Sequence, residues 1–341
     1  YSKIIFPEKT EPVSLILTFR NEEEALAANL PNVMKSADVE FEVVAVDDCS
    51  QDQSMEVLKA FKNEFPNFRI SLLKQQIQNS DKMAQNLALK AAHYDWVNIL
   101  PVSVNIPGEN WLHEFSSRLN HENDIVVHYS NIAPAKSIYN RIYRLEMLYQ
   151  QFKSFGFILN GLPFVLSQDN VAFKKQHYFD YNGYRGKISE PFAKLELVIN
   201  SFINKKAVAV NISADTAITR NEIVTWKDYL ELIKKEQNIK KFLPFSIRFL
   251  LNLIEWSYLL LVPFGLFSVL LITQFWPFVL SVAVILVAVH LVIIKKMQTR
   301  LKDSKIFLPS LTLGLVLPYL KLFYRISFIR YGSRKEWRIG S

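Results

Sequence analysis

The sequence contains one long stretch without a charged side chain, Trp256 to Ile294, which is 39 residues long. As a single helix it would extend about 58 Å at ~1.5 Å per residue, whereas the hydrocarbon core of a membrane is roughly 30 Å thick. The stretch therefore has to fold back on itself, and its one polar, turn-prone point is Thr273–Pro277. Within a segment 241–294 that starts with an interfacial part, we predict two transmembrane helices at about 249–272 and 277–294. The alternative is a buried hairpin in the core of a soluble protein.

The net charge of +8 is unevenly distributed along the chain. From Lys295 to the end there are 11 basic and two acidic residues, which is +9, whereas the first 294 residues carry 29 basic and 30 acidic ones, which is −1. The excess positive charge follows the apolar stretch directly, which fits a membrane surface and gives little support to nucleic-acid binding. We therefore expect a lipid bilayer as a partner and no nucleic acid.

Basic residues flank both ends of the predicted hairpin, so both ends are expected on the cytoplasmic side. This predicts a multi-pass protein of a bacterial-type inner (plasma) membrane whose soluble domain is cytoplasmic. Within the basic tail 295–341, the apolar run 306–320 is 15 residues long and contains Pro309 and Pro318. It is too short to cross the membrane, and we predict a re-entrant or interfacial segment.

Residues 13–240 follow a lead-in of residues 1–12 and alternate short apolar runs with segments of helical spacing. Alternation of this kind predicts an α/β domain with a doubly wound sheet. In such sheets ligands bind beyond the carboxyl ends of the strands. The segments Thr18–Glu22, Asp47–Asp52 and Pro101–Asn105 are therefore the candidate site.

Four motifs follow one another through this domain. They are Thr18-Phe19-Arg20-Asn21-Glu22-Glu23, Val46-Asp47-Asp48-Cys49-Ser50-Gln51-Asp52, Ser80-Asp81-Lys82 with Ala84 and Asn86, and Asn170-Val171-Ala172-Phe173-Lys174 with Gly183-Tyr184. In their order and approximate spacing they resemble family-2-type glycosyltransferases of the GT-A fold. The resemblance covers about 13–240 and implies a GT-A-type, Rossmann-like, doubly wound mixed sheet that binds a nucleotide-sugar donor.

The resemblance also implies where the donor binds. Acidic side chains at the first two strand ends accept hydrogen bonds from the base and ribose, and basic ones steady the diphosphate. The residues predicted for this nucleotide-sugar side are Thr18, Arg20, Glu22, Asp47, Asp48 and Lys82. In the structural alternative, Asp47 and Asp48 only end a strand and Asp52 opens a helix.

The catalytic motifs of the family are degraded. Members hold Mg²⁺ or Mn²⁺ on a D-x-D pair, but Pro101 and Ser103 stand at those positions, so the expected metal ligands are missing. The Glu-Asp pair that bears the general base is Glu190-Pro191, which leaves Glu190 as a weak substitute base. Of the Q-x-x-R-W motif only Trp226 remains.

Two functions stay open at this point. The first is an inverting glycosyltransferase that transfers a sugar to a membrane-associated acceptor, either lipid-linked or glycan. The second is a catalytically inactive pseudo-glycosyltransferase that serves as a membrane scaffold or as the partner subunit of another protein. The retained nucleotide-side motifs favour the first, and the joint loss of the metal, base and arginine positions favours the second.

Overall fold

The computed structural model describes residues 10–35, 39–271, 276–303, 310, 313–314 and 316–324. The chain forms two compact units, Tyr1–Leu243 and Pro244–Ser341. Most of the predicted lead-in 1–12, much of the apolar segment 306–320 and the end of the basic tail lie outside the described residues. The predictions for those segments therefore stay predictions.

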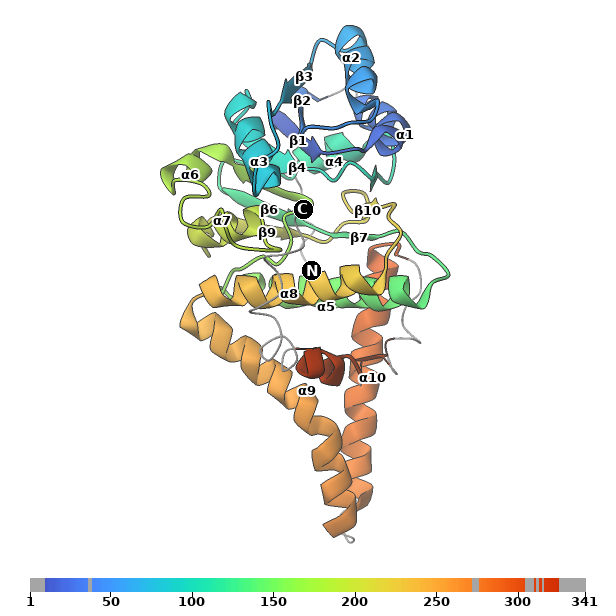
Figure 1. The fold of residues 1–341 in the computed structure, drawn as a ribbon. Coiled ribbons are helices and arrows are strands. Elements are labelled where there is room, and N and C mark those ends of the chain that lie inside the picture. Colours follow the sequence, from blue (N-terminus) through green and yellow to red (C-terminus); the bar gives the residue numbers. More distant parts are fainter. Residues whose placement is uncertain are drawn as a thin grey trace. The chain divides into compact units, whose positions relative to one another are not determined.

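The first unit is built around a seven-stranded sheet with the order β3-β2-β1-β4-β8-β6-β9 (Figure 1). The strands are β1 (Val13–Phe19), β2 (Phe41–Asp47), β3 (Phe68–Leu72), β4 (Trp96–Ile99), β6 (Ile125–His128), β8 (Val171–Lys174) and β9 (Val208–Asn211). Strands β1 to β4 are parallel to one another, and β8 runs antiparallel to both β4 and β6. This arrangement confirms the predicted mixed α/β sheet.

The strands at the centre of this sheet are apolar because both of their faces are covered. Every residue of β2 is buried, and so is every residue of β1 except the partly buried Thr18. Strands buried on both faces are near-continuous apolar runs rather than alternating ones. The helices that connect β1 to β4 are α1 (Glu23–Met34), α2 (Ser54–Glu64) and α3 (Ser80–Ala91), and α4 (Trp111–Ser116) follows. Of these, α3 packs against β1 and β2.

A second, small sheet has the order β5-β10-β7 and was not predicted. It consists of β5 (Val104–Asn105), β7 (Ser130–Ile132) and β10 (Ile218–Arg220). Strand β10 is antiparallel to β5, with Arg220 opposite Val104, and parallel to β7. The Asn221 N–H also donates to the Ser103 carbonyl at 2.9 Å. These pairings bring residues 218–222 to the segment that follows β4.

Two longer helices, α5 (Ile138–Leu159) and α8 (Trp226–Phe242), pack against each other in the same unit (Figure 1). Ser137 caps α5, and Thr225 with Asp228 forms a capping box at the start of α8. Short helices α6 (Lys175–Asp180) and α7 (Leu195–Phe202) complete the unit. Helices α5 and α8 form walls of the cavity described below.

The second unit contains α9 (Phe245–Leu271) and α10 (Trp276–Arg300), close to the two helices predicted there. No helix within the described residues is long and apolar enough to cross a membrane, which does not support the predicted transmembrane hairpin.

Candidate functional site

The loops that follow β1 and β2 brace each other. The Asn21 N–H donates to Ser50 Oγ at 2.9 Å, and the Gln51 N–H donates to Asn21 Oδ1 at 2.8 Å. Asn21 and Cys49 both adopt a left-handed backbone conformation, with φ of 54° and 59°. Asparagine tolerates this region better than most residues, which is how the first loop turns sharply at the end of β1.

Asp52 fixes the starts of two helices at once. One carboxylate oxygen accepts from the Glu23 N–H and the other from the Ser54 N–H, both at 3.1 Å. Hydrogen bonds from Ser54 in particular lower the pKa of Asp52, against a small opposing effect of burial. These contacts place the Asp52 carboxylate at the start of α2, next to its N-cap residue Gln53.

Asp47 and Asp48 are both buried at the end of β2. Asp47 Oδ1 accepts from the N–H and the hydroxyl of Ser50, so this carboxylate holds the turn together. Asp48 Oδ2 accepts from Ser80 Oγ at 2.7 Å, which ties β2 to α3. Asp48 Oδ1 is buried with no hydrogen-bond partner among the described residues, so this oxygen keeps an unused acceptor.

The other residues predicted for the nucleotide side surround this loop. Thr18 and Arg20 are partly buried at the end of β1, and the Arg20 Nε atom is buried without a partner in the described part of the chain. Glu22 is exposed at the surface. Its pKa is raised by partial burial, then by the nearby carboxylates of Glu222 and Asp52. Glu222 therefore lies close to the nucleotide side, although it is 200 positions away in sequence.

Lys82 has a different role from the predicted one. Its ammonium group is buried and donates to the carbonyls of Lys187, Ile188 and Glu190. Burial lowers its pKa, partly offset by the carboxylates nearby. An ammonium has three hydrogens, and three carbonyls occupy them here. Lys82 thus anchors the loop 187–190 and has no donor left for a diphosphate.

Glu190 and Pro191 are held by their backbone. The Glu190 carbonyl accepts from Lys82, and the Pro191 carbonyl accepts from Asn238 Nδ2 at 2.8 Å. The Glu190 side chain is half-buried, and it does not line the cavity described next. Its role as a substitute base stays a prediction.

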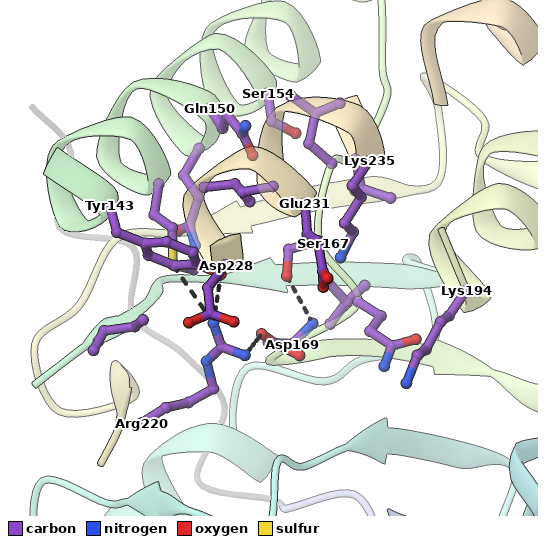
Figure 2. A pocket seen from close by; sticks show the side chains of 18 of the residues that line it. Tyr143, Gln150, Ser154, Ser167, Asp169, Lys194, Arg220, Asp228, Glu231 and Lys235 are labelled. Carbon is purple, nitrogen blue, oxygen red and sulfur yellow. Dashed lines mark hydrogen bonds and ion pairs between the residues drawn. The ribbon is translucent and has the colours of Figure 1, made fainter. Parts of the chain in front are cut away.

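A cavity of about 460 Å³ lies between the sheet and helices α5 and α8 (Figure 2). Its walls combine apolar side chains with a ring of charged ones. The charged residues are Asp169, Lys194, Arg220, Glu222, Asp228, Glu231 and Lys235. A cavity that combines apolar walls with convergent polar groups is a candidate small-molecule site.

Arg220 lines the cavity, and Figure 2 shows its guanidinium directed at Asp169. Its Nη1 atom lies 3.6 Å from Asp169 Oδ2 and 3.6 Å from Glu222 Oε2. Burial lowers the pKa of Arg220, but the attraction of Asp169 and then Glu222 outweighs it and the pKa is raised. Ser103 completes the cluster, because its hydroxyl donates to Glu222 Oε1 at 2.7 Å.

Lys235 is part of a second ion pair at the wall of the cavity. Its ammonium lies 2.8 Å from Oε1 of Glu196, a residue of α7 that is fully buried. Burial acts to lower the pKa of Lys235, and the attraction of Glu196, followed by Asp169, raises it overall. This pair joins α7 to α8 across the cavity wall.

None of the seven charged residues of the cavity was predicted from the sequence as a site residue. Asp169 directly precedes the motif that starts at Asn170, and Glu222 stands at the first position of the degraded Q-x-x-R-W motif. Their places beside family motifs could have marked Asp169 and Glu222 as site residues. Neither place in the sequence indicated that the two side chains lie close together.

The residues at the end of β4 do not fit a divalent cation. Pro101 has no side-chain oxygen, and the Ser103 hydroxyl is directed at Glu222. Both carboxylates in reach, Asp169 and Glu222, lie beside the guanidinium of Arg220. No group of three or more His, Cys, Asp or Glu side chains in the described part of the chain is placed to hold a metal ion. Hard cations need several oxygen ligands, which this set does not offer.

One solved structure is similar in fold over most of the chain. The mannosyltransferase PcManGT from Pyrobaculum calidifontis, solved with GDP-Man and Mn²⁺, is similar in structure with a TM-score of 0.54 and 14% identity. The match covers 92% of this chain and 87% of that one. At this identity the likeness shows the fold alone.

Two further solved structures are similar with lower TM-scores. S. aureus TarS 1-349 has a TM-score of 0.47 and 18% identity, covering 68% of this chain and 65% of that one, so this chain spans less than two thirds of TarS 1-349. Glucosyl-3-phosphoglycerate synthase from Mycobacterium tuberculosis has a TM-score of 0.45 and 13% identity, covering 69% and 81%.

Sequence comparison gives the family. No protein of curated function matches the chain. The family model described as glycosyl transferase family 2 matches residues 14–181, which include β1 to β4 and β8 and the two braced loops. Over these residues, the chain belongs to glycosyl transferase family 2.

Proposed function

We propose that this protein transfers a sugar from a nucleotide-sugar donor to an acceptor hydroxyl. The nucleotide would bind at the ends of β1 and β2, beside Glu22 and Asp48, and the sugar and acceptor would occupy the cavity. The observation that carries this proposal is the position of Glu222. It lines the cavity and accepts a hydrogen bond from Ser103, which follows β4, the strand that pairs with β1, so the two candidate subsites adjoin.

The reaction requires one base and one charge-stabilising group. The acceptor oxygen forms a bond to the anomeric carbon, the bond from that carbon to the diphosphate breaks, and the acceptor proton passes to a carboxylate. Two carboxylates are candidates for this base. Glu190 is favoured by its place in the family motif, and Asp169 by its place in the cavity, where its side chain is 12% exposed.

The test is an assay of the full chain with a panel of nucleotide sugars and extracted membrane lipids or glycans. Transfer by the wild type is the expected result. Comparison of Glu190→Ala with Asp169→Asn then assigns the base, because loss of a general base typically reduces the rate about 10²–10⁴-fold. No transfer from any donor by the wild type would contradict the proposal.

The structure also offers an observation in favour of the second function, an inactive pseudo-glycosyltransferase acting as a scaffold or partner subunit. Asp169 and Glu222 are both paired with Arg220, so neither carboxylate can take up the acceptor proton without losing an ion pair. Nucleotide binding without any transfer, together with co-purification of a defined partner, is the result that this alternative predicts.

We further propose that the acceptor is membrane-associated and that the protein is attached to the cytoplasmic face of a bacterial-type plasma membrane through α9 and α10. Large apolar side chains on these helices support attachment, because they are exposed to solvent. They include Phe249, Leu253, Trp256, Val284 and Ile285. Flotation of the full chain with anionic liposomes, compared with a Val284→Lys/Ile285→Lys variant, tests this. Equal recovery of both in the unbound fraction would contradict it.

A further inference from the structure

The end of β4 has lost its own carboxylates, but two others reach it from distant parts of the chain. Strand β8 runs antiparallel to β4, with Ala172 opposite Asn98. Asp169, two residues before β8, therefore lies at the sheet edge where β4 ends. Glu222 reaches the same place through the hydrogen bond from Ser103. Two carboxylates therefore lie at this edge of the sheet, although residues 101–105, which follow β4, contain none.

A guanidinium lies between these two carboxylates. Arg220 Nη1 is 3.6 Å from an oxygen of each, and the pairing of Arg220 with Val104 fixes the backbone of Arg220 beside the β4 end. Its Nη2 atom makes only long contacts, 3.4 Å to the Tyr143 hydroxyl and 3.7 Å to the Met147 sulfur. Its Nε atom is buried with no partner among the described residues.

This arrangement leaves Arg220 with hydrogen-bonding capacity to spare. A guanidinium has five N–H donors in a planar fork, which matches the oxygens of a phosphate. The two carboxylates hold the guanidinium in place without occupying all of its N–H donors. The side chain is 16% exposed on the wall of the cavity, so a ligand there has access to it.

We propose that the Arg220 guanidinium takes the position and the role of the divalent cation, so that the donor diphosphate binds without a metal ion. The proposal rests on the function proposed above, that a nucleotide sugar binds at this edge. The chain's own residues then stabilise the leaving diphosphate by hydrogen bonds and a fixed positive charge. A divalent cation has no place in this arrangement, since the same two carboxylates already hold a positive group.

The charge of the cluster gives the proposal a distinctive consequence. Asp169, Glu222 and Arg220 sum to −1, whereas two carboxylates around a divalent cation sum to zero. The negative surplus weakens the binding of a diphosphate. Removal of the Glu222 charge should therefore strengthen nucleotide binding, whereas removal of a metal-ligating carboxylate would weaken it.

The experiment is calorimetry of the full chain with uridine and guanosine diphosphates, each in EDTA and in Mn²⁺. We expect the wild type to bind one of them with Kd values that agree within about twofold between the two conditions. Arg220→Gln should weaken binding at least about tenfold with no rescue by Mn²⁺, and Glu222→Gln should tighten it about threefold. Arg69→Gln is the matched control, because Arg69 also pairs with a carboxylate, Glu42, but outside the site.

Four outcomes would overturn the proposal. Binding by the wild type only with Mn²⁺ refutes metal independence and leaves the proposed function intact. Binding of neither nucleotide in either condition refutes both. Unchanged binding by Arg220→Gln, or weakened binding by Glu222→Gln, shows that Arg220 does not contact the diphosphate. If thermal unfolding shows that Arg220→Gln does not fold, then Arg220→Lys, which keeps the charge but loses the fork, takes its place and should weaken binding about fivefold.

Discussion

The two halves of the sheet edge that carry the candidate site are built in different ways. At the ends of β1 and β2, the bracing hydrogen bonds join residues about thirty positions apart, such as Asn21 and Ser50. At the end of β4, the hydrogen bond from Ser103 reaches Glu222, 119 positions away. The first half is a pair of neighbouring loops, and the second is assembled from β5, β8 and β10.

This difference explains which half keeps its family motifs. In the first half the side chains that hold the turn also border the proposed nucleotide site, so we expect a substitution there to cost stability as well as binding. Asp47 and Asp52 show this, since their carboxylates accept backbone N–H groups of the loops. In the second half the charges come from separate segments. Carboxylates lost at one position are replaced in space by others without disturbing the backbone.

The largest expected effect is on the second half, at the ion pair between Glu196 and Lys235. Glu196→Gln leaves the Lys235 ammonium without its buried partner, and breaking such a pair costs about 3 kcal/mol. Chemical denaturation should show this loss in the free energy of unfolding. The double variant Glu196→Gln/Lys235→Met is the control, and we expect it to regain most of the loss. If Glu196→Gln is as stable as the wild type, then the stability of this part of the protein does not depend on the ion pair between Glu196 and Lys235.

The next effect is at Lys82, which lies on α3 and binds the loop 187–190. Lys82→Met removes the ammonium that binds three carbonyls of the loop 187–190, and we expect a loss of about 2 kcal/mol in unfolding free energy. Nucleotide affinity should change less than about threefold, because no donor of Lys82 is directed at the ligand. A large loss of affinity with unchanged stability would restore the predicted role of Lys82 in diphosphate binding.

A third test addresses binding in the first half. Asp48→Asn removes the charge of the carboxylate whose Oδ1 has no partner, and we expect nucleotide affinity to fall about tenfold, or ~1.4 kcal/mol. Asp180→Asn, on α6, is the matched control. Calorimetry measures both. Equal affinities would mean that Asp48 serves only to tie β2 to α3.

The smallest effect is a pH dependence that links the halves. The raised pKa of Glu22 means that the folded state binds more protons than the unfolded state, so this group favours folding below pH 4.5 and that contribution is lost as the pH rises through the folded pKa. Glu22→Gln should therefore be more stable than the wild type at pH 7, by about 0.5 kcal/mol or less because solvent screens this exposed side chain.

The control for this prediction is the partner carboxylate. The difference between Glu22→Gln and the wild type should disappear below pH 4 in thermal unfolding, and it should shrink in a Glu222→Gln background. A difference of the same size in that background would show that Glu222 and Glu22 do not interact, and that the two halves are electrostatically separate.

The uncharged stretch correctly indicated two helices, and α9 and α10 lie within a few residues of the predicted ranges at their inner ends. Within the part of the chain that the structure describes, no helix is long and apolar enough to cross a membrane, so the predicted crossing finds no support.

The sequence by itself determined the first hundred residues of the fold. The predicted alternation of short apolar runs with segments of helical spacing agrees with β1 to β4 and α1 to α3, because both patterns are local properties of the sequence. Only the tertiary structure decided the second half of the site. Strand β10 is three residues long, too short for a periodic signal, and the meeting of Asp169, Arg220 and Glu222 depends on non-local pairing. No local pattern encodes which distant charges will share one end of a sheet.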